Sequence, residues 1–465
     1  MNANGDLGRK ENRPMNLRTN RREFLKRGLG ASLGAVTLPG ILSARSPNGK
    51  TQHASIGVGG MGWGDVQQIG SHPDVEIVAI CDIDTARMAA AAKKFPNARR
   101  YQHWRELLDK EGDRIDSVNV STPDHMHALI TMTALHQGKN VYCQKPLTHD
   151  VYEARQVATA AAKAQVVTQM GIQVNATIGY RMAVRMIRDG VIGKVRRVYA
   201  WSNKPVGNYR PTGPRPTGED PIPATLDWDA WLGVAPVRPY KHGVYHPTWW
   251  RGWQDFGVGW LGDMGCHIVD TPYQALKLGS PLRIRAEVEP AWRDTPSRRT
   301  ETWPTWQIVR YTFPGNEMTA GKTLDLTWSD GYKYPPDRVR RHIDDHEFPP
   351  QGSLLIGEAG AMLLPHAAGP QLFPKDKFKG YARPEIAPRN HYHHWVDACR
   401  SKGKTGAGFD YAGPLTETIL LGTVALRCPD KELAWDGEQM KITNLPEANQ
   451  YLHRSYRERW ATAGS

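Results

Sequence analysis

A glycine-rich turn between an apolar strand and a helix is the feature that most constrains the fold of this chain. Residues 53–56 have the composition of a buried strand, and they run directly into Gly57-x-Gly59-x-x-Gly62. Glycine makes up 45 of the 465 residues, so this spacing alone is a weak signal. Its context is stronger, because a helical stretch follows and residues 75–82 form a second apolar run that ends on Asp82. This order is typical of a parallel α/β sheet that binds a dinucleotide.

The residue types in this turn suit a pyrophosphate and a ribose. Glycines permit a tight turn and close approach of the backbone, and helix-terminal N–H groups attract the phosphate charge. The carboxylate of Asp82 can accept hydrogen bonds from a ribose diol and repels a 2′-phosphate, which predicts NAD in preference to NADP. Arg87 follows closely and would weaken that preference, and the alternative role of Asp82 is a helix cap or turn residue. The expected cofactor contacts here are Gly57, Gly59, Gly60, Met61, Gly62 and Asp82.

Two further predicted strands end in polar loops. Residues 115–120 lead into a Ser-Thr-Pro-Asp-His-Met-His loop, and residues 139–143 lead into Gln144-Lys145-Pro146. Ligands of open parallel sheets bind at the carboxyl ends of strands, and a following proline restricts the backbone of the lysine. The predicted cofactor contacts in these loops are Ser121, Thr122, Pro123, His125, His127, Gln144 and Lys145. Residues 166–171 form the last predicted strand, so this α/β Rossmann domain should span residues 51–171.

A carboxylate and an imidazole lie four residues apart at Asp263 and His267, just ahead of an apolar segment. In a helix, residues with this spacing lie on one face about one turn apart, so both side chains can reach one pocket. A histidine is near-neutral at physiological pH and suits the role of a base. The structural alternative is a helix cap and a buried hydrogen-bond donor.

Residues 172–465 are predicted to form a second, α+β domain that binds substrate and supports oligomerisation. Strands that alternate with turns, such as residues 306–313 and 324–328, indicate a large, mostly antiparallel open sheet. Residues 203–225 read as a long Pro- and Gly-rich loop, residues 338–347 as a solvated loop, and residues 415–427 as a core helix. The candidate substrate contacts are Gln173, His246, Trp250 and Arg251, with core packing as the alternative for the tryptophan.

Composition excludes several classes of protein. The net charge is +13, but the first 50 residues carry +7 of it, and the remainder forms no basic run interleaved with aromatics, so no nucleic-acid partner is expected. The five cysteines include no CxxC pair, which argues against a disulfide framework and a zinc site. Residues 390–395 contain three histidines without an acidic or thiol partner at ligand spacing, and they resemble a capped helix start. No metal is therefore predicted.

The first 50 residues resemble a twin-arginine export signal. Arg21-Arg22 and a Phe-Leu-Lys sequence precede a short Gly/Ala-rich apolar stretch, which is too short for a stable membrane span, so no integral membrane domain is expected. The alternative is a disordered basic tail. Export predicts a periplasmic location, and it predicts a tightly bound cofactor, because that route resembles one used by proteins that load a cofactor before export.

Taken together, these motifs resemble the glucose-fructose oxidoreductase/inositol dehydrogenase family, known as Gfo/Idh/MocA. The resemblance rests on the Gly57 loop, the loop after residue 120, the lysine-proline turn and the Asp263/His267 pair. It implies that Lys145, Asp263 and His267 are the catalytic groups beside the nicotinamide. It also implies a homo-oligomer, a dimer or tetramer. One departure is Gln144, which stands where the family usually has Glu.

The resemblance implies an NAD(P)-dependent oxidoreductase acting on a CH–OH group of a sugar, polyol or glycoside, with NAD tightly bound. His267 would take the hydroxyl proton, Lys145 would stabilise the developing alkoxide, and Asp263 would orient substrate or imidazole. Two alternatives stay open. One is an NAD-dependent glycoside hydrolase or lyase that oxidises the sugar transiently, and the other is a non-catalytic sugar-binding or regulatory protein.

Overall fold

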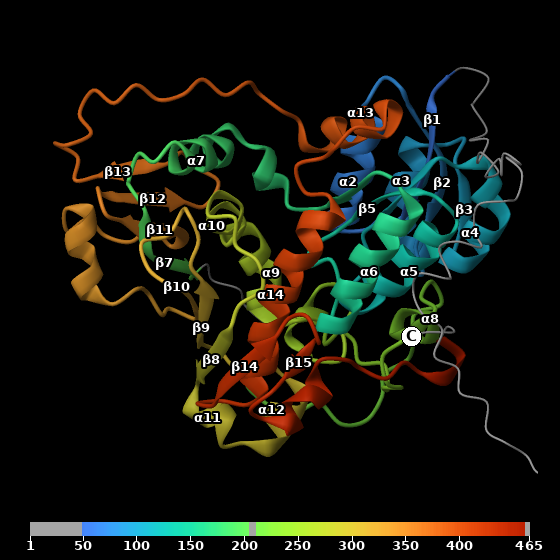
Figure 1. Cartoon of the computed structure of the whole chain (residues 1–465). Coiled ribbons are helices and arrows are strands. Elements are labelled where there is room, and N and C mark those ends of the chain that lie inside the picture. The colour runs from blue at the N-terminus through green and yellow to red at the C-terminus, as the bar shows by residue number, and fades with distance from the viewer. Residues whose placement is uncertain (1–48, 204–210, 461–465) are drawn as a thin grey trace, which may run out of the picture. The chain divides into compact units, whose positions relative to one another are not determined.

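The computed structural model describes residues 49–203 and 211–460 of the chain (Figure 1). The predicted leader lies outside these ranges up to residue 48, as do residues 204–210 of the predicted loop. Within the described ranges, no helix is long and apolar enough to cross a lipid bilayer.

The first half of the described chain is a six-stranded sheet in which every pairing is parallel. Its order is β3-β2-β1-β4-β5-β6, so the winding direction reverses between β1 and β4, where a ligand crevice forms at the carboxyl ends of the strands. The predicted Rossmann fold is confirmed. The strands are β1 (Thr51–Ile56), β2 (Val75–Cys81), β3 (Arg99–Tyr101), β4 (Ser117–Val120), β5 (Asn140–Cys143) and β6 (Thr168–Met170), and the helices are α2 (Met61–Gly70), α3 (Thr85–Lys94), α4 (Trp104–Glu111), α5 (Asp124–His136) and α6 (Val151–Ala164).

Local sequence explains where these elements begin and end. The strands β1, β2 and β4 are buried almost throughout, as strands covered by helices on both faces must be. Asp84 caps α3 by accepting a hydrogen bond from the backbone N–H of Ala86. Asp150 and Glu153 form a capping box at the start of α6.

The second half contains a nine-stranded sheet of order β13-β12-β11-β7-β10-β9-β8-β14-β15, antiparallel except for the β7–β10 pair. Strand β9 alternates buried and more exposed residues, as expected when one face is packed and the other open. The predicted mostly antiparallel sheet is confirmed. The strands are β7 (Val195–Ser202), β8 (Arg283–Val288), β9 (Gln307–Pro314), β10 (Thr323–Asp330), β11 (Gln351–Gly357), β12 (Ala361–Pro365), β13 (Gln371–Phe373), β14 (Glu432–Asp436) and β15 (Lys441–Ile442).

Helices α9 and α14 cover one face of the nine-stranded sheet and contribute to the main hydrophobic core. Helix α13 instead packs on α2 of the dinucleotide-binding half, where Tyr392, Trp395 and Val396 join a core cluster with Val58 and Val66 (Figure 1). A helix from late in the chain therefore packs against the first domain, although it lies after residue 171, where that domain is predicted to end. The principal helices of this half are α7 (Ile178–Arg188), α8 (Trp228–Leu232), α9 (Gly259–Ile268), α10 (Asp270–Ala275), α11 (Pro290–Arg293), α12 (Pro296–Glu301), α13 (His391–Ser401) and α14 (Phe409–Arg427).

The prediction of a solvated loop at residues 338–347 was wrong for its first half. Residues Asp337–Ile343 form a 3-10 helix, with Val339 and Ile343 buried in a cluster that contains Tyr199 and Trp201. Two apolar residues four apart are enough to anchor a short helix, and the many charges around them concealed this signal in the sequence.

Candidate active site

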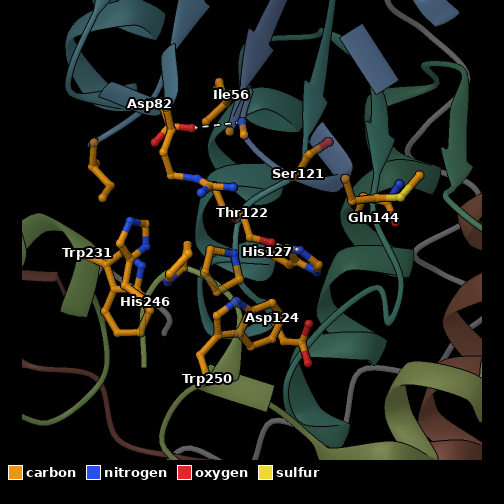
Figure 2. A pocket seen from close by; sticks show the side chains of 18 of the residues that line it. Ile56, Asp82, Ser121, Thr122, Asp124, His127, Gln144, Trp231, His246 and Trp250 are labelled. Carbon is orange, nitrogen blue, oxygen red and sulfur yellow. Dashed lines mark hydrogen bonds between the residues drawn. The ribbon is translucent and has the colours of Figure 1, made fainter. Parts of the chain in front are cut away.

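A cavity of about 500 Å³ lies at the carboxyl ends of β1, β2, β4 and β5 and is bordered on its other side by residues 231–251 (Figure 2). Its size falls within the range of small-molecule sites. Figure 2 shows Asp82 on one wall with Trp231 and His246 facing it, and Gln144 at the far end. The cavity is lined by Ile56, Gly57, Gly59, Gly60, Met61, Cys81, Asp82, Ile83, Arg87, Trp104, Ser121, Thr122, Pro123, Asp124, His127, Gln144, Lys145, Trp231, His246, Pro247, Thr248, Trp250 and Arg251.

The glycine turn has the close contacts of a phosphate cradle. Gly57 has φ +80°, and a Cβ there would lie 2.6 Å from the carbonyl oxygen of Ser121. A Cβ on Gly62 would lie 2.0 Å from the carbonyl oxygen of Gly57, so Gly62 supports the turn from behind and does not line the cavity. Helix α2 begins at Met61, and Gly59, Gly60 and Met61 line the cavity, so the N-terminal end of this helix, which attracts anions, adjoins it. These residues fit the pyrophosphate of a dinucleotide.

Asp82 ends β2 and lines the cavity. One carboxylate oxygen accepts hydrogen bonds from the N–H groups of Val58 and Gly59 at 3.0 and 3.2 Å, and the other accepts one from Asp84 at 3.1 Å. Burial raises its pKa, against these hydrogen bonds. The carboxylate thus braces the turn and also lies where a ribose would bind. Arg87 also lines the cavity, beside Gly59.

A charged cluster occupies the opposite end of the cavity. The Lys145 ammonium and the Arg251 guanidinium both donate hydrogen bonds to Asp263 Oδ1, the latter at 3.2 Å. Burial alone would raise the pKa of Asp263, but these two cations lower it well below its usual range. Asp124 belongs to the same cluster, and burial raises its pKa to about 7. Sequence reasoning missed Asp124, although its place after a strand and at the start of α5 was a usable signal.

His267 lies one turn beyond Asp263 on α9, as predicted from the spacing. Burial, followed by the Lys145 cation, lowers its pKa well below the usual range, so the imidazole is neutral. Among the described residues its Nδ1 has no hydrogen-bond partner, and its ring lies 5.9 Å from that of His366. Asp263 hydrogen-bonds Lys145 and Arg251, so it orients the lysine and not the imidazole.

Several predicted contacts lie elsewhere. The ring nitrogens of His125 lie 2.9 and 3.3 Å from the carbonyl oxygens of Trp231 and Phe256, so His125 joins α5 to residues 231–256 and does not line the cavity. Gln173 donates to the hydroxyls of Tyr142 and Tyr392 at 3.2 Å, and it too is outside the lining. Asp263 and His267 adjoin the cavity through Lys145 without lining it.

His246 is a predicted substrate contact, and it lines the cavity. Its Nε2 lies 2.9 Å from Asp84 Oδ2, just after β2, at the end of the cavity that holds Asp82. The physical reason is that the chain before His246 is tied to this edge of the sheet, with Asp84 bridged to Leu226. His246 therefore faces the ribose end and lies away from the Lys145 end.

The residues 226–256, which we call the tryptophan lobe, form their own small core around Trp228, Trp231, Trp250 and Trp253. The rings of Trp228 and Trp231 stack with centroids 4.7 Å apart. Trp231 and Trp250 also line the cavity, whereas Trp253 is buried within the lobe. Core packing and cavity lining are thus combined at Trp250.

In the parts of the chain that the structure describes, no three or more His, Cys, Asp or Glu side chains lie so that they could hold a metal ion together.

The fold and site together define a two-domain, dinucleotide-binding protein with a lysine–carboxylate pair at one end of its cofactor cavity. Residues 52–172 match the oxidoreductase family with an NAD-binding Rossmann fold, and residues 188–320 match the C-terminal alpha/beta domain of the same family, which together exceed half of the chain. The chain belongs to the Gfo/Idh/MocA oxidoreductase family, and the prediction of an NAD-binding domain is confirmed.

Individual relatives cover part of the chain. A glycosyl hydrolase family 109 protein from Shewanella sp. strain MR-4 is 30% identical over 203 residues, which is 38% of this chain and 44% of the relative. A levoglucosan dehydrogenase from Pseudarthrobacter phenanthrenivorans is 24% identical over 191 residues, 41% and 40% of the two chains. These matches span less than half the length of either relative.

Solved structures share the fold along most of the chain. The WlbA dehydrogenase from Bordetella pertussis, in complex with NADH and UDP-GlcNAcA, has a TM-score of 0.57 and 16% identity, covering 83% of this chain and 99% of that one. An inositol dehydrogenase homolog from Azotobacter vinelandii, complexed with NADH and myo-inositol, has a TM-score of 0.55 and 16% identity, covering 83% and 98%. At this identity the likeness concerns the fold.

Proposed function

We propose that this protein is an NAD-dependent oxidoreductase that acts on a CH–OH group of a sugar, polyol or glycoside. The observation that carries the proposal is the Lys145–Asp263 ion pair, which lies at the end of the dinucleotide cavity opposite Asp82. A dinucleotide whose adenosine ribose lies at Asp82 has its nicotinamide at this other end. The named relatives and structures include sugar and polyol dehydrogenases, which supports the substrate class.

The residues around Lys145 suit oxidation of an alcohol. NAD, when bound, supplies the two-electron acceptor for the carbinol C–H bond. Lys145, held by Asp263, presents a positive charge that stabilises an oxygen as it loses its proton. His267 is a neutral imidazole in this environment, and because its lowered pKa makes it a weak base, it can accept that proton only where the charge of Lys145 stabilises the oxygen at the same time.

The proposal includes a cofactor that stays bound between turnovers. Trp231, His246 and Trp250 of the tryptophan lobe line the cavity across from the glycine turn. Two backbone hydrogen bonds tie the start of the lobe to the sheet edge. Thr85 N–H donates to the oxygen of Thr225, the residue just before the lobe, at 2.9 Å, and Asp227 N–H donates to Ile83 O at 3.1 Å. We expect the lobe to hinder the release of NAD, which favours slow exchange. The carboxylate of Asp82 supports NAD over NADP.

Redox-neutral glycoside cleavage is the second candidate, because several partial relatives are named glycosyl hydrolase family 109 proteins and one is named an alpha-N-acetylgalactosaminidase. In this chemistry the sugar is oxidised to a ketone, the proton on the α carbon and the leaving group on the β carbon are lost to give an enone, water adds at the β carbon, and the ketone is reduced again. Aryl glycosides separate the two functions. Release of the aryl alcohol with no net NADH supports the second, whereas NADH formation or transfer between two sugars supports the first.

The test of the cofactor is native mass spectrometry of the purified protein. Retained NAD or NADH would support the proposal, and a protein that neither retains nor binds either nucleotide would contradict it.

We also propose export by the twin-arginine pathway to the periplasm. Changing Arg21 and Arg22 to Lys should block this export, which a fractionation experiment measures. A homo-oligomer is proposed as well, since alternate residues on one face of β9 are more exposed, and sedimentation at micromolar concentration tests it.

A further inference from the structure

Asp65 is a fully buried carboxylate directly behind the cavity wall. It lies on α2 and has no exposed surface. Ser121 Oγ donates to it at 2.7 Å, Gln144 Nε2 at 2.8 and 2.9 Å to its two oxygens, and Tyr392 Oη at 2.8 Å. One side chain thus connects three loops or helices that are far apart in sequence. Buried carboxylates are retained only when hydrogen-bonded in this way.

Gln144 transmits this contact to the charged cluster. Its Nε2 is bound to Asp65, and its Oε1 accepts a hydrogen bond from the backbone N–H of Lys145 at 3.3 Å. Lys145 in turn pairs with Asp263. An amide side chain can donate to a carboxylate at one atom and accept from a backbone N–H at the other, which a carboxylate at this position cannot do while ionised.

The charge of Asp65 also constrains which residue can occupy position 144. A glutamate there would place a second carboxylate within about 3 Å of Asp65 in a buried site, where two like charges cannot both stay ionised. The Gln144 amide donates to Asp65 without holding a titratable proton, whereas a glutamate at this position could make the same two hydrogen bonds only while it stays protonated.

We propose that Asp65 is a positioning residue of the cofactor site, which fixes the Gln144 amide and through it the Lys145 turn, and that the acid at 65 and the amide at 144 can be exchanged but not replaced singly. This inference rests on the proposed function for the role of Lys145. Its test compares the binding of NADH among variants and does not measure turnover, so the inference can fail while the proposed function stands.

The test compares Asp65→Asn, Gln144→Glu and the exchange variant that carries both changes, each as the full chain freed of copurifying nucleotide. Binding is followed by energy transfer from tryptophan to NADH, since Trp104, Trp231 and Trp250 line the cavity. Each single variant is expected to bind NADH about tenfold or more weakly, and the exchange variant to return to within about threefold of wild type.

Asp270→Asn is the matched control. Asp270 is equally buried and accepts hydrogen bonds from an amide, Asn175, and a tyrosine, Tyr411, but none of these residues lines the cavity. The control should lower the melting temperature as Asp65→Asn does and leave NADH affinity unchanged.

Losses that multiply in the exchange variant, an exchange variant that fails to fold, or a single variant with wild-type affinity would each overturn the inference while the proposed function stands. If the wild-type protein does not bind NADH, both the inference and the proposed function are contradicted. Rescue by exchange supports the inference even if one single variant does not fold.

Discussion

Asp124 is a cavity-lining side chain whose titration changes the stability of the folded protein. It lines the cavity near Lys145 and Arg251, and burial raises its pKa to about 7, far above that of an aspartate in an unfolded chain. Between about pH 4 and pH 7 the folded protein therefore holds a proton that the unfolded chain has lost. The free energy of unfolding falls as the pH rises through this window.

Asp124→Asn is expected to remove that fall, because asparagine resembles the protonated acid and does not titrate. At pH 4 the variant and wild type should be similarly stable, and at pH 8 the variant should be more stable by on the order of 1–4 kcal/mol. Urea unfolding at several pH values measures this. Parallel stability curves for the two proteins would contradict the raised pKa.

His267→Ala is expected to reduce turnover by roughly 100- to 10,000-fold, the range associated with loss of a general base, while NADH affinity stays near wild type. Turnover of any sugar or glycoside that wild type accepts, together with nucleotide titration, measures both quantities. The control is His53→Ala, which removes another buried imidazole, bonded to Ser117 and Asn119 within the first sheet. It should lower the melting temperature and spare turnover, and unchanged turnover in His267→Ala would remove His267 from the proposed chemistry.

At the scale of elements, two glycines of α2 differ sharply in what surrounds them. A Cβ at Gly62 would lie 2.0 Å from the carbonyl oxygen of Gly57, whereas at Gly64 its nearest contact is the end of the Met61 side chain at 3.9 Å. Gly62→Ala is therefore expected to displace the turn, destabilise the fold and weaken NADH binding at least tenfold. Gly64→Ala should stabilise the helix by up to about 1 kcal/mol and leave binding unchanged. Thermal unfolding and NADH titration compare the pair, and equal effects would contradict the assignment.

The elements with strong local patterns were predictable from the sequence. The buried strands and the glycine turn of the first sheet, the alternating strands of the second, and the i, i+4 placement of Asp263 and His267 all follow from short-range periodicity. Contacts between distant segments were not predictable in this way. Asp65 meets Gln144 and Tyr392 only because three elements converge, and His246 reaches Asp84 only because the chain before it is tied to the sheet edge. Such pairings are set by tertiary packing, which periodicity does not encode.

At the scale of the whole molecule, the tryptophan lobe brings residues of the predicted substrate-binding domain to the ribose end of the cofactor cavity. The backbone ties at Ile83, Thr85 and Leu226 hold the base of the lobe, and the His246–Asp84 pair holds its cavity wall. A single substitution at His246 can release its pair with Asp84 while the backbone ties remain.

His246→Ala should therefore raise the dissociation rate of NADH while it lowers the free energy of unfolding only slightly. Loss of one partly buried, charge-assisted hydrogen bond corresponds to roughly a tenfold faster dissociation rate. Lys241→Ala is the control, since Lys241 pairs with Asp220 and does not line the cavity, and it should leave the rate unchanged. Stopped-flow displacement of NADH by excess NAD measures both. If the two variants release NADH at the wild-type rate, the lobe does not govern retention, and a cofactor that stays bound between turnovers would need another cause.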